Sequence, residues 1–238
     1  MNIALCIPTR SSIMQGAFYR LLQASMGMTQ YVQANLQGGA YILTSMRAHA
    51  GDARNDIVQR LLKDTDAEWS FWLDDDAMPP VDTFQRLFNH GKDIVVPVHR
   101  TKTPPFNCPA WMYTDEGTKL RVLLEPPRLQ RISHCGMHAA LIHRKVFEKM
   151  NPLVGEKGCF QVHPGLSEDC FFFQMAGKIG FEVGMDTSFT VDHAMETSVE
   201  EVRKLSENTP LLLPHGKGAE EGPPAGPFVS PHPAVPLP

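Results

Sequence analysis

One stretch, from Trp69 to Pro80, constrains this chain more than any other. It begins with an apolar run, continues with three consecutive aspartates and ends at a Pro-Pro pair. The apolar run predicts a buried strand, and the two prolines predict where it stops. Asp74, Asp75 and Asp76 therefore fall at the C-terminal end of a strand, which is the edge at which open α/β sheets bind their ligands.

Three adjacent carboxylates repel one another, so folding alone gives no reason to place them together. A bound divalent cation gives such a reason, because Mg²⁺ and Mn²⁺ take carboxylate oxygens and often share them with substrate phosphates. The alternative is a solvated acidic turn. The aromatic residues Phe71 and Trp72, which lead directly into the triplet, favour a core strand and therefore the cation site.

The length and composition of the chain predict one domain followed by a tail. The chain has 238 residues, of which 42% are hydrophobic, enough for a substantial core. We expect the domain to span residues 1–206. Residues 207–238 are rich in proline and glycine, which predicts a segment without a packed core. The net charge of -4 gives no overall basic surface for nucleic acid.

Cysteine usage and hydropathy predict a cytoplasmic protein. The five cysteines are scattered, odd in number and without C-x-x-C spacing, which indicates reduced thiols rather than a disulfide framework or a zinc ribbon. The N-terminus has no basic region before its short apolar run, so we interpret it as a strand and not as a signal peptide. No apolar stretch approaches the ~20 residues that a membrane span needs.

Strands alternate with helices along the first half of the chain. Residues 2–7 predict a buried strand, 13–26 a helix and 40–44 a second strand, an order typical of a βαβ unit. We therefore predict an α/β fold with a mostly parallel central sheet flanked by helices, and a small antiparallel portion in the C-terminal half. Further helices are expected at 52–66, 81–90, 144–150, 168–178 and 198–206, and further strands at 93–98, 111–113, 120–124, 135–143 and 181–191.

A cation held by Asp76 and Asp74 needs another protein ligand. His193 follows an apolar strand near the end of the predicted domain, where it can supply an imidazole. Taken alone, such a histidine is more often a surface or satisfied residue, but this chain already requires a ligand. An imidazole beside carboxylates favours Mn²⁺ over Ca²⁺.

Other polar clusters also lie at strand ends or helix starts. Arg54 and Asn55 are expected in the first turn of a helix that Asp52 can cap, where backbone N–H groups attract anions. Glu168 and Asp169 open another helix, for which we expect Ser167 as the N-cap and Gly180 as the C-cap. There the two acids either complement the helix dipole or provide a general base. We also expect a close backbone approach to a ligand at Gly136. The remaining cluster is Pro8, Thr9 and Arg10, directly after the first strand.

Taken in order, these motifs resemble the GT-A glycosyltransferases, similar to the family 2 type and especially to compact versions found in bacteriophage and bacterial genomes. The resemblance covers roughly residues 2–195. Its most recognisable piece is Phe71–Asp76, which matches the Asp-x-Asp metal and nucleotide motif. The other matching pieces are Leu5–Arg10, Ala53–Asn55, His138–Phe147, Ser167–Asp169 and Val191–His193.

The resemblance implies a GT-A fold and a metal-dependent transfer from a nucleotide-diphosphate sugar, with a UDP-sugar favoured. It implies that Asp76 is the main ligand of Mn²⁺ or Mg²⁺, that Asp74 contacts the metal or the ribose, and that His193 completes the set. Asp169, next to Glu168, would be the base of an inverting reaction or would position the acceptor in a retaining one. The residues implied to bind the nucleotide sugar are Pro8, Thr9, Arg10, Arg54, Asn55, Asp74, Asp75 and Gly136.

Two other functions and several kinds of acceptor stay open from the sequence. A sugar-phosphate nucleotidyltransferase usually carries a Gly-rich loop after its first strand, and residues 8–12 contain no glycine. A non-catalytic sugar- or nucleotide-binding module would not need both Asp169 and a metal site. We expect the acceptor to be a glycan, a protein or a small molecule or, by resemblance to phage relatives, a hydroxymethylated base in DNA. The middle of the chain is biased toward basic residues, which could contact DNA phosphates, although such residues more often form a solvated surface. They are Arg100, Lys102, Arg121, Arg128 and Arg131.

Overall fold

The computed structural model describes residues 1–10, 13, 15–113 and 118–195. The helix expected at 198–206 and the tail at 207–238 lie outside the described residues. In chain order the elements are β1 (Ile3–Thr9), α1 (Gln15–Tyr31), the π-helical η1 (Val32–Leu36), β2 (Ala40–Met46), α2 (Ala50–Asp64), β3 (Trp69–Leu73), β4 (Ala77–Met78), α3 (Thr83–Phe88), β5 (Ile94–Val98), β6 (Ala110–Tyr113), β7 (Lys119–Arg121), β8 (Leu129–Ile132), β9 (His134–Cys135), β10 (Ala139–His143), α4 (Arg144–Val154), the 3-10 turn η2 (Gly155–Lys157), α5 (Glu168–Lys178), β11 (Val183–Thr190) and β12 (Asp192–His193).

A seven-stranded sheet in the order β2-β1-β3-β10-β5-β11-β8 forms the centre of the molecule. β1 runs parallel to β2 and β3, and β5 runs parallel to β11, whereas β10 and β8 run antiparallel to their neighbours. This confirms the predicted α/β class and the small antiparallel portion. The insertion of β10 between β3 and β5 is the feature that the strand pattern did not predict.

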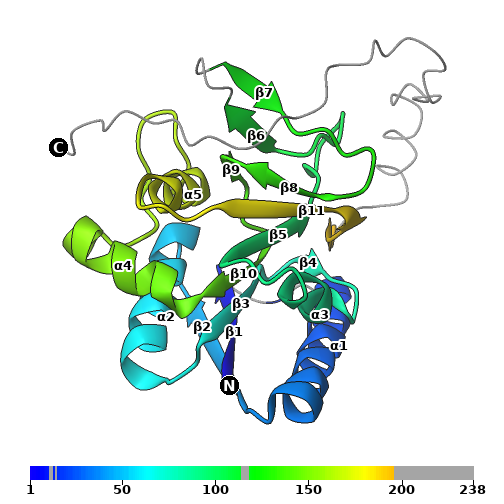
Figure 1. The fold of residues 1–238 in the computed structure, drawn as a ribbon, viewed down its shortest axis with the longest axis vertical. Helices are drawn as coiled ribbons and strands as arrows, with labels where there is room; N and C mark the ends of the chain where they lie inside the picture. Colours follow the sequence, from blue (N-terminus) through cyan, green and yellow to red (C-terminus); the bar gives the residue numbers. More distant parts are fainter. Residues whose placement is uncertain (11–12, 14, 114–117, 196–238) are drawn as a thin grey trace.

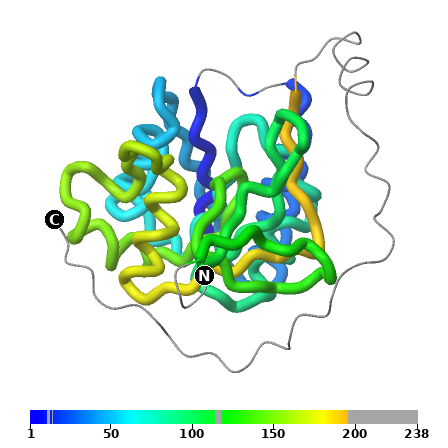
Figure 2. Tube along the Cα trace, turned by 90° about the horizontal axis from the view of Figure 1, so that it is seen from above, coloured from blue at the N-terminus to red at the C-terminus, as the bar shows by residue number. Residues whose placement is uncertain are grey.

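Helices cover both faces of this sheet, so its central strands are apolar on both sides (Figures 1 and 2). On β3, Phe71 and Leu73 join the core beneath α1 and α3, while Trp72 joins the core beneath α2, α4 and α5. The indole N–H of Trp72 donates to the hydroxyl of Ser70 at 2.8 Å. The continuous apolar run before the acidic triplet is therefore a fully buried central strand, as predicted.

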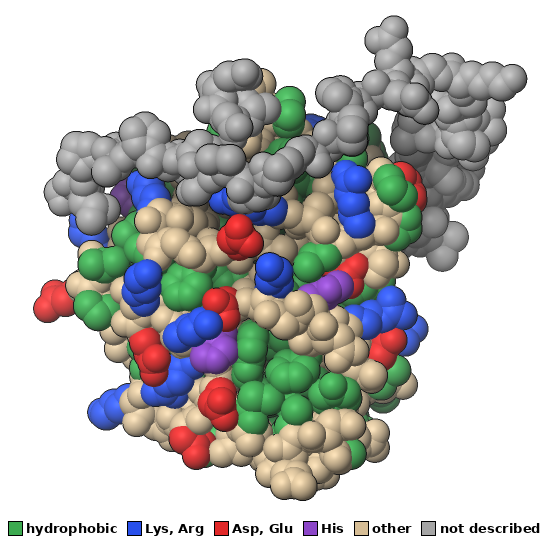
Figure 3. All heavy atoms as spheres, in the orientation of Figure 1, with side chains coloured by type: hydrophobic (Ala, Val, Ile, Leu, Met, Phe, Trp, Pro, Cys, Tyr) green, Lys and Arg blue, Asp and Glu red, His purple; other side chains and the backbone are tan. Residues whose placement is uncertain are grey.

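Several large apolar side chains of α1 point away from the sheet, although they would be expected to pack on it. Phe18, Leu22 and Met26 are between 47% and 54% exposed. Figure 3 shows hydrophobic side chains gathered in the lower middle of this face of the molecule. Because α1 is apolar on more than one side, its periodicity did not decide which side packs. The side chains that pack on the sheet are Ala17, Leu21, Ala24 and Met28.

Two local predictions need correction. The single strand expected at 135–143 is divided into β9 and β10, and the break between them carries Gly136 and His138. α2 begins at Ala50 with His49 as its N-cap, so Asp52 lies in the first turn and does not cap the helix. Arg54 consequently lies in the second turn, where it has no direct access to the free N–H groups of the helix start.

Arg144 joins the end of α2 to the start of α4. Its guanidinium donates to the carbonyl oxygens of Leu61, Leu62 and Thr65 at 2.6–2.9 Å. These carbonyls belong to the last turn of α2 and the residue after it, which otherwise lack intrahelical partners.

We expect Arg144→Ala to lower the free energy of unfolding by about 2–3 kcal/mol, because several carbonyls lose a charged donor at once. Urea denaturation followed by circular dichroism measures this change. The control is Arg86→Ala, which removes an exposed arginine that pairs with Asp82 and lies over the ring of Phe189 and should cost about 1 kcal/mol. Equal losses in the two variants would contradict the capping role of Arg144.

Candidate functional site

The acidic triplet forms a tight turn at the C-terminal end of β3, as the sequence predicts. The N–H of Asp74 donates to the carbonyl of His138 at 3.0 Å, and the N–H of Ala77 donates back to the carbonyl of Asp74 at 3.0 Å. After the turn, β4 pairs with β12, which places Ala77 opposite His193. The triplet is thus held between the start of β10 and the end of the described chain.

Asp76, His138 and His193 come together at this turn, and we call them the Asp76 group. Each offers one ligand atom, and the three atoms lie within 4.8 Å of one another. Asp76 Oδ1 is 3.5 Å from Nδ1 of His193 and 3.6 Å from Nδ1 of His138. Both Nδ1 atoms are buried without a hydrogen-bond partner. Buried nitrogens that face a carboxylate without a partner are what a divalent cation would satisfy.

Backbone hydrogen bonding fixes the orientation of the His138 ring. Its Nε2 lies 2.9 Å from the carbonyl oxygen of Asp192. Since a carbonyl only accepts, Nε2 carries the proton, and the Nδ1 lone pair of the neutral ring points at Asp76. Burial lowers the pKa of His138, but the carboxylates of Asp74 and Asp76 and the Asp192 carbonyl outweigh it, so the pKa is raised. A cation bound in the group therefore competes with a proton.

Asp76 itself is held ionised. Burial alone would raise its pKa, but the adjacent His193, Lys102 and His138 outweigh burial and hold the pKa well below its usual value. Lys102 contacts Asp76 Oδ2, the oxygen that faces away from the two imidazoles. The sequence predicted Asp76 and His193 as ligands but assigned no role in metal binding to His138, and it placed Lys102 only among generally basic residues.

Arg54 is the buried centre of a second group of charges. Its side chain is only 4% exposed and donates to Asp74 Oδ1 at 2.8 Å and to Glu168 Oε1 at 2.8 Å. It also donates to the carbonyl of Met137 at 2.9 Å. Burial raises the pKa of Asp74, but the Arg54 guanidinium and the His138 ring together outweigh it and leave the pKa lowered. Arg54 thus ties the acidic triplet at the end of β3 to the acidic start of α5.

Asp74 lies between Arg54 and His138. One of its oxygens pairs with Arg54, and the other lies 3.7 Å from Nδ1 of His138. In the described part of the chain, the third residue of the Asp76 group is His138 and not Asp74. Contact of Asp74 with a metal or a ribose stays a prediction.

Asp169 is held by hydrogen bonds from three donors. Its Oδ2 accepts from the N–H of Met137 at 3.2 Å, and its Oδ1 accepts from the N–H of Cys170 at 2.7 Å and from the Ser167 hydroxyl. Ser167 is the N-cap of α5 by position, as predicted, but its side chain makes no capping bond to the helix. The carboxylate of Asp169 is consequently oriented by the loop that also carries Gly136.

Gly136 packs closely against His99. A Cβ at Gly136 would lie 2.6 Å from Nε2 of His99, so only a glycine leaves room for this ring. The close approach to a ligand expected at Gly136 stays a prediction. His99 is 5% exposed. Burial, followed by the charges of His138 and His193, lowers its pKa to about 3. His99 is therefore a neutral ring that supports the loop next to the Asp76 group.

The predicted nucleotide-binding residues lie in two places. Pro8 and Thr9 end β1, and the N–H of Arg10 donates to Asp75 Oδ2 at 3.1 Å, so this loop borders the triplet. The hydroxyl of Thr9 is buried without a hydrogen-bond partner. Asn55 lies elsewhere, because its amide bonds the backbone N–H and carbonyl of Phe160, both at 2.9 Å, and so anchors the loop after η2.

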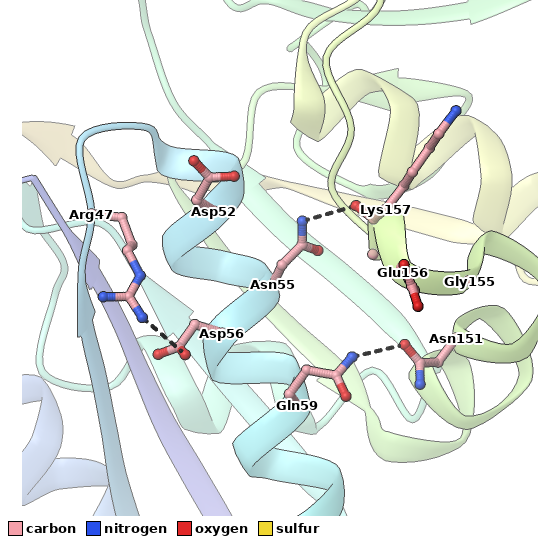
Figure 4. A pocket seen from close by; sticks show the side chains of 10 residues that line it. Arg47, Asp52, Asn55, Asp56, Gln59, Asn151, Gly155, Glu156 and Lys157 are labelled. Carbon is pink, nitrogen blue, oxygen red and sulfur yellow. Dashed lines mark hydrogen bonds and ion pairs between the residues drawn. The ribbon is translucent and has the colours of Figure 1, made fainter.

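A cleft of about 720 Å³ lies between α2 and the end of α4. Figure 4 shows its polar lining, including the pairs Arg47–Asp56 and Gln59–Asn151. Asn55 is the one predicted site residue in this lining, and none of the Asp76 group belongs to it. The cleft is open and carries charges of both signs, so we do not assign the reaction centre to it.

Within the described parts of the chain, none of the helices is long and apolar enough to cross a bilayer. All five cysteines lie in these parts and carry free thiols.

The fold has counterparts among solved structures, although no known protein-family model and no curated protein matches the chain. A197 from STIV has a TM-score of 0.53 and 18% sequence identity, with 82% of this chain and 87% of that chain covered. GalNAc-T7, solved with UDP, GalNAc and Mn²⁺, has a TM-score of 0.56 and 11% identity, with 83% of this chain and 44% of that chain covered. At these identities the likeness establishes the fold, which is the predicted GT-A-type arrangement.

Proposed function

We propose that this protein is a metal-dependent glycosyltransferase that transfers a sugar from a nucleotide-diphosphate sugar, with UDP as the favoured nucleotide. One observation carries the proposal. On a GT-A-type fold, two buried imidazole Nδ1 atoms without partners face the carboxylate of Asp76 at the carboxyl end of β3. This edge is where α/β sheets bind ligands. GalNAc-T7, which shares the fold, was solved with UDP, GalNAc and Mn²⁺.

The donor set favours Mn²⁺ over Mg²⁺. Mg²⁺ is bound mainly through carboxylates, phosphates and water, whereas two imidazoles and one carboxylate suit a first-row transition metal. Asp76, His138 and His193 would hold the ion. When bound, such an ion neutralises negative charge on a diphosphate leaving group. One of these ligands is already oriented for binding, since Nε2 of His138 donates a hydrogen bond to the backbone carbonyl of Asp192.

The remaining residues divide between donor and acceptor. We assign Thr9, Arg10 and Asp75 to the nucleotide, because their loop borders the triplet. Asp74 would face the ribose or the metal from a position that Arg54 fixes. Arg54 itself acts by positioning, since it is buried between its two carboxylates.

Asp169 would receive the proton of the acceptor hydroxyl in an inverting reaction, and in a retaining reaction it would position the acceptor. Its hydrogen bonds from Met137, Ser167 and Cys170 use only part of the acceptor capacity of a carboxylate. A base must come within hydrogen-bond reach of the proton that it removes. Glu168, paired with Arg54, would help to shape the acceptor side.

For the acceptor we favour a glycan over modified DNA. Lys102 pairs with Asp76, and Arg131 lies 3.9 Å from a carboxylate oxygen of Glu182, so the basic bias of the sequence is partly neutralised within the chain. Binding along a DNA backbone requires cations that are free to meet phosphates. Duplex DNA with hydroxymethylated bases remains the second arm of the acceptor screen.

The proposal is tested by measuring nucleotide release from a panel of UDP-sugars, with Mn²⁺, Mg²⁺ or EDTA present. We expect release of the nucleoside diphosphate with Mn²⁺, a weaker rate with Mg²⁺ and none with EDTA. Mass spectrometry of candidate glycans and hydroxymethylated DNA identifies the acceptor. Formation of UTP and a sugar 1-phosphate when pyrophosphate is added with the UDP-sugar would instead indicate a nucleotidyltransferase. Turnover that is unchanged by EDTA would contradict the metal site, and binding without turnover of any donor would indicate a binding module.

In the same assay, His138→Ala should lower the affinity for Mn²⁺ by at least about tenfold, because the group loses one of its ligands. His163→Ala is the matched control, since His163 is exposed and contacts Gln161 at 3.3 Å. A wild-type affinity for Mn²⁺ in His138→Ala would remove His138 from the ligand set.

A further inference from the structure

Lys102 places a cation of the protein itself at the Asp76 group. It lies in the loop between β5 and β6, and its ammonium contacts Asp76 Oδ2. Backbone hydrogen bonds close this loop, from the N–H of Thr101 to the carbonyl of Asn107 at 2.9 Å and from the N–H of Phe106 to the carbonyl of Thr103 at 3.0 Å. The contact therefore comes from a defined turn that presents Lys102 to the site.

The two oxygens of Asp76 serve different partners. Oδ1 faces the imidazoles of His138 and His193, while Oδ2 faces Lys102. The side chain of Asp76 is 14% exposed and that of Lys102 is 46% exposed. Lys102 thus reaches a largely buried carboxylate from the solvent side, and packing of the core does not require it there. Its ammonium reduces the negative charge that Asp76 presents to any other cation.

We infer that Lys102 provides a second positive charge at the donor site, besides the metal ion, and that it pairs with two groups in turn. In the free protein it pairs with Asp76 and competes with a divalent cation for that carboxylate. With a donor bound it pairs with the diphosphate. This second part rests on the proposed function. A lysine suits such an exchange, because it is a compact charge on a flexible stem and binds phosphate without a fixed geometry.

Two binding measurements on Lys102→Met test the inference, and the changes in affinity that we expect from them are opposite. With Mn²⁺ alone, followed by the electron paramagnetic resonance signal of the free ion, the variant should bind about tenfold more tightly, since Asp76 loses a competing charge. With UDP at saturating Mn²⁺, followed by calorimetry, it should bind about tenfold more weakly, since the diphosphate loses a cation. If Lys102 had a purely structural role, its loss would change the affinities for Mn²⁺ and UDP in the same direction.

Two controls separate charge from folding. Lys102→Arg keeps the positive charge and should stay within about threefold of the wild type for Mn²⁺. Lys145→Met removes a lysine of similar exposure, 49%, that pairs with Asp93 at 2.7 Å away from the site, and it should change neither affinity. Thermal unfolding of all variants shows whether the fold is retained.

The two arms have separate consequences. If Lys102→Met binds Mn²⁺ as the wild type does, or more weakly, the competition for Asp76 is overturned. If it binds UDP equally well or better, the pairing with the diphosphate is overturned. If the wild type binds Mn²⁺ but no nucleoside diphosphate, the proposed donor class fails and the diphosphate pairing fails with it, while the Mn²⁺ arm still decides the competition.

Discussion

Asp76→Asn is expected to lower the affinity for Mn²⁺ by about 100-fold and to reduce metal-dependent nucleotide release to background. The reason is geometric and electrostatic. Oδ1 of Asp76 faces both His138 and His193, so the substitution removes the one negatively charged metal ligand proposed for the group. An amide at this position keeps the size of the side chain but loses its negative charge, which hard and borderline cations require.

Asp75→Asn is the matched control for Asp76→Asn, because it makes the same chemical change one residue away. Asp75 accepts a hydrogen bond from the N–H of Arg10 and is not part of the Asp76 group. Its Mn²⁺ affinity should stay within about threefold of the wild type, while its affinity for UDP is free to fall. Both values come from calorimetry with the ion and the nucleotide added separately. Equal Mn²⁺ affinities in Asp75→Asn and Asp76→Asn would refute the assignment of Asp76.

Arg54→Met is expected to lower the free energy of unfolding by about 3–5 kcal/mol, a large fraction of the stability of a domain. Removal of the guanidinium leaves Asp74 and Glu168 largely buried without their counter-ion, and the carbonyl of Met137 without its donor. Neighbouring carboxylates outweigh burial and raise the pKa of Arg54, so it is charged at every accessible pH. Urea denaturation monitored by tryptophan fluorescence measures the loss.

Three comparisons identify the cause of that loss. Arg47→Met removes an exposed arginine paired with Asp56 at 3.3 Å and should cost less than about 1 kcal/mol. Combining Arg54→Met with Glu168→Gln should recover part of the stability, because one of the two unpaired charges is removed. Arg54→Lys should remain destabilised, since an ammonium lacks the planar fork that reaches both carboxylates. A loss in Arg54→Met no larger than in Arg47→Met would contradict the central role of Arg54.

Much of the fold follows from local patterns that need no distant partner. The short apolar run before the triplet, which a Pro-Pro pair follows, predicts β3, because a strand buried on both faces carries successive apolar residues such as Phe71, Trp72 and Leu73. Ser167 at the N-cap position and Gly180 just after the last turn likewise predict α5. The side of α1 that packs was not predictable, since Leu21 and Leu22 are equally apolar and only the sheet distinguishes them.

The sequence by itself determined that carboxylates end a central strand and that a histidine closes the described domain, because residue order and hydropathy are local properties. Only the tertiary structure decided what these groups meet. β10 enters the sheet antiparallel beside β3, which places Ala139 opposite Leu73 and brings His138 to the triplet. The same folding buries Arg54 between two acids and sets Lys102 on Asp76. Such contacts join residues that are 20 to 114 positions apart in the chain, a proximity that strand pairing and burial create and that no local pattern encodes.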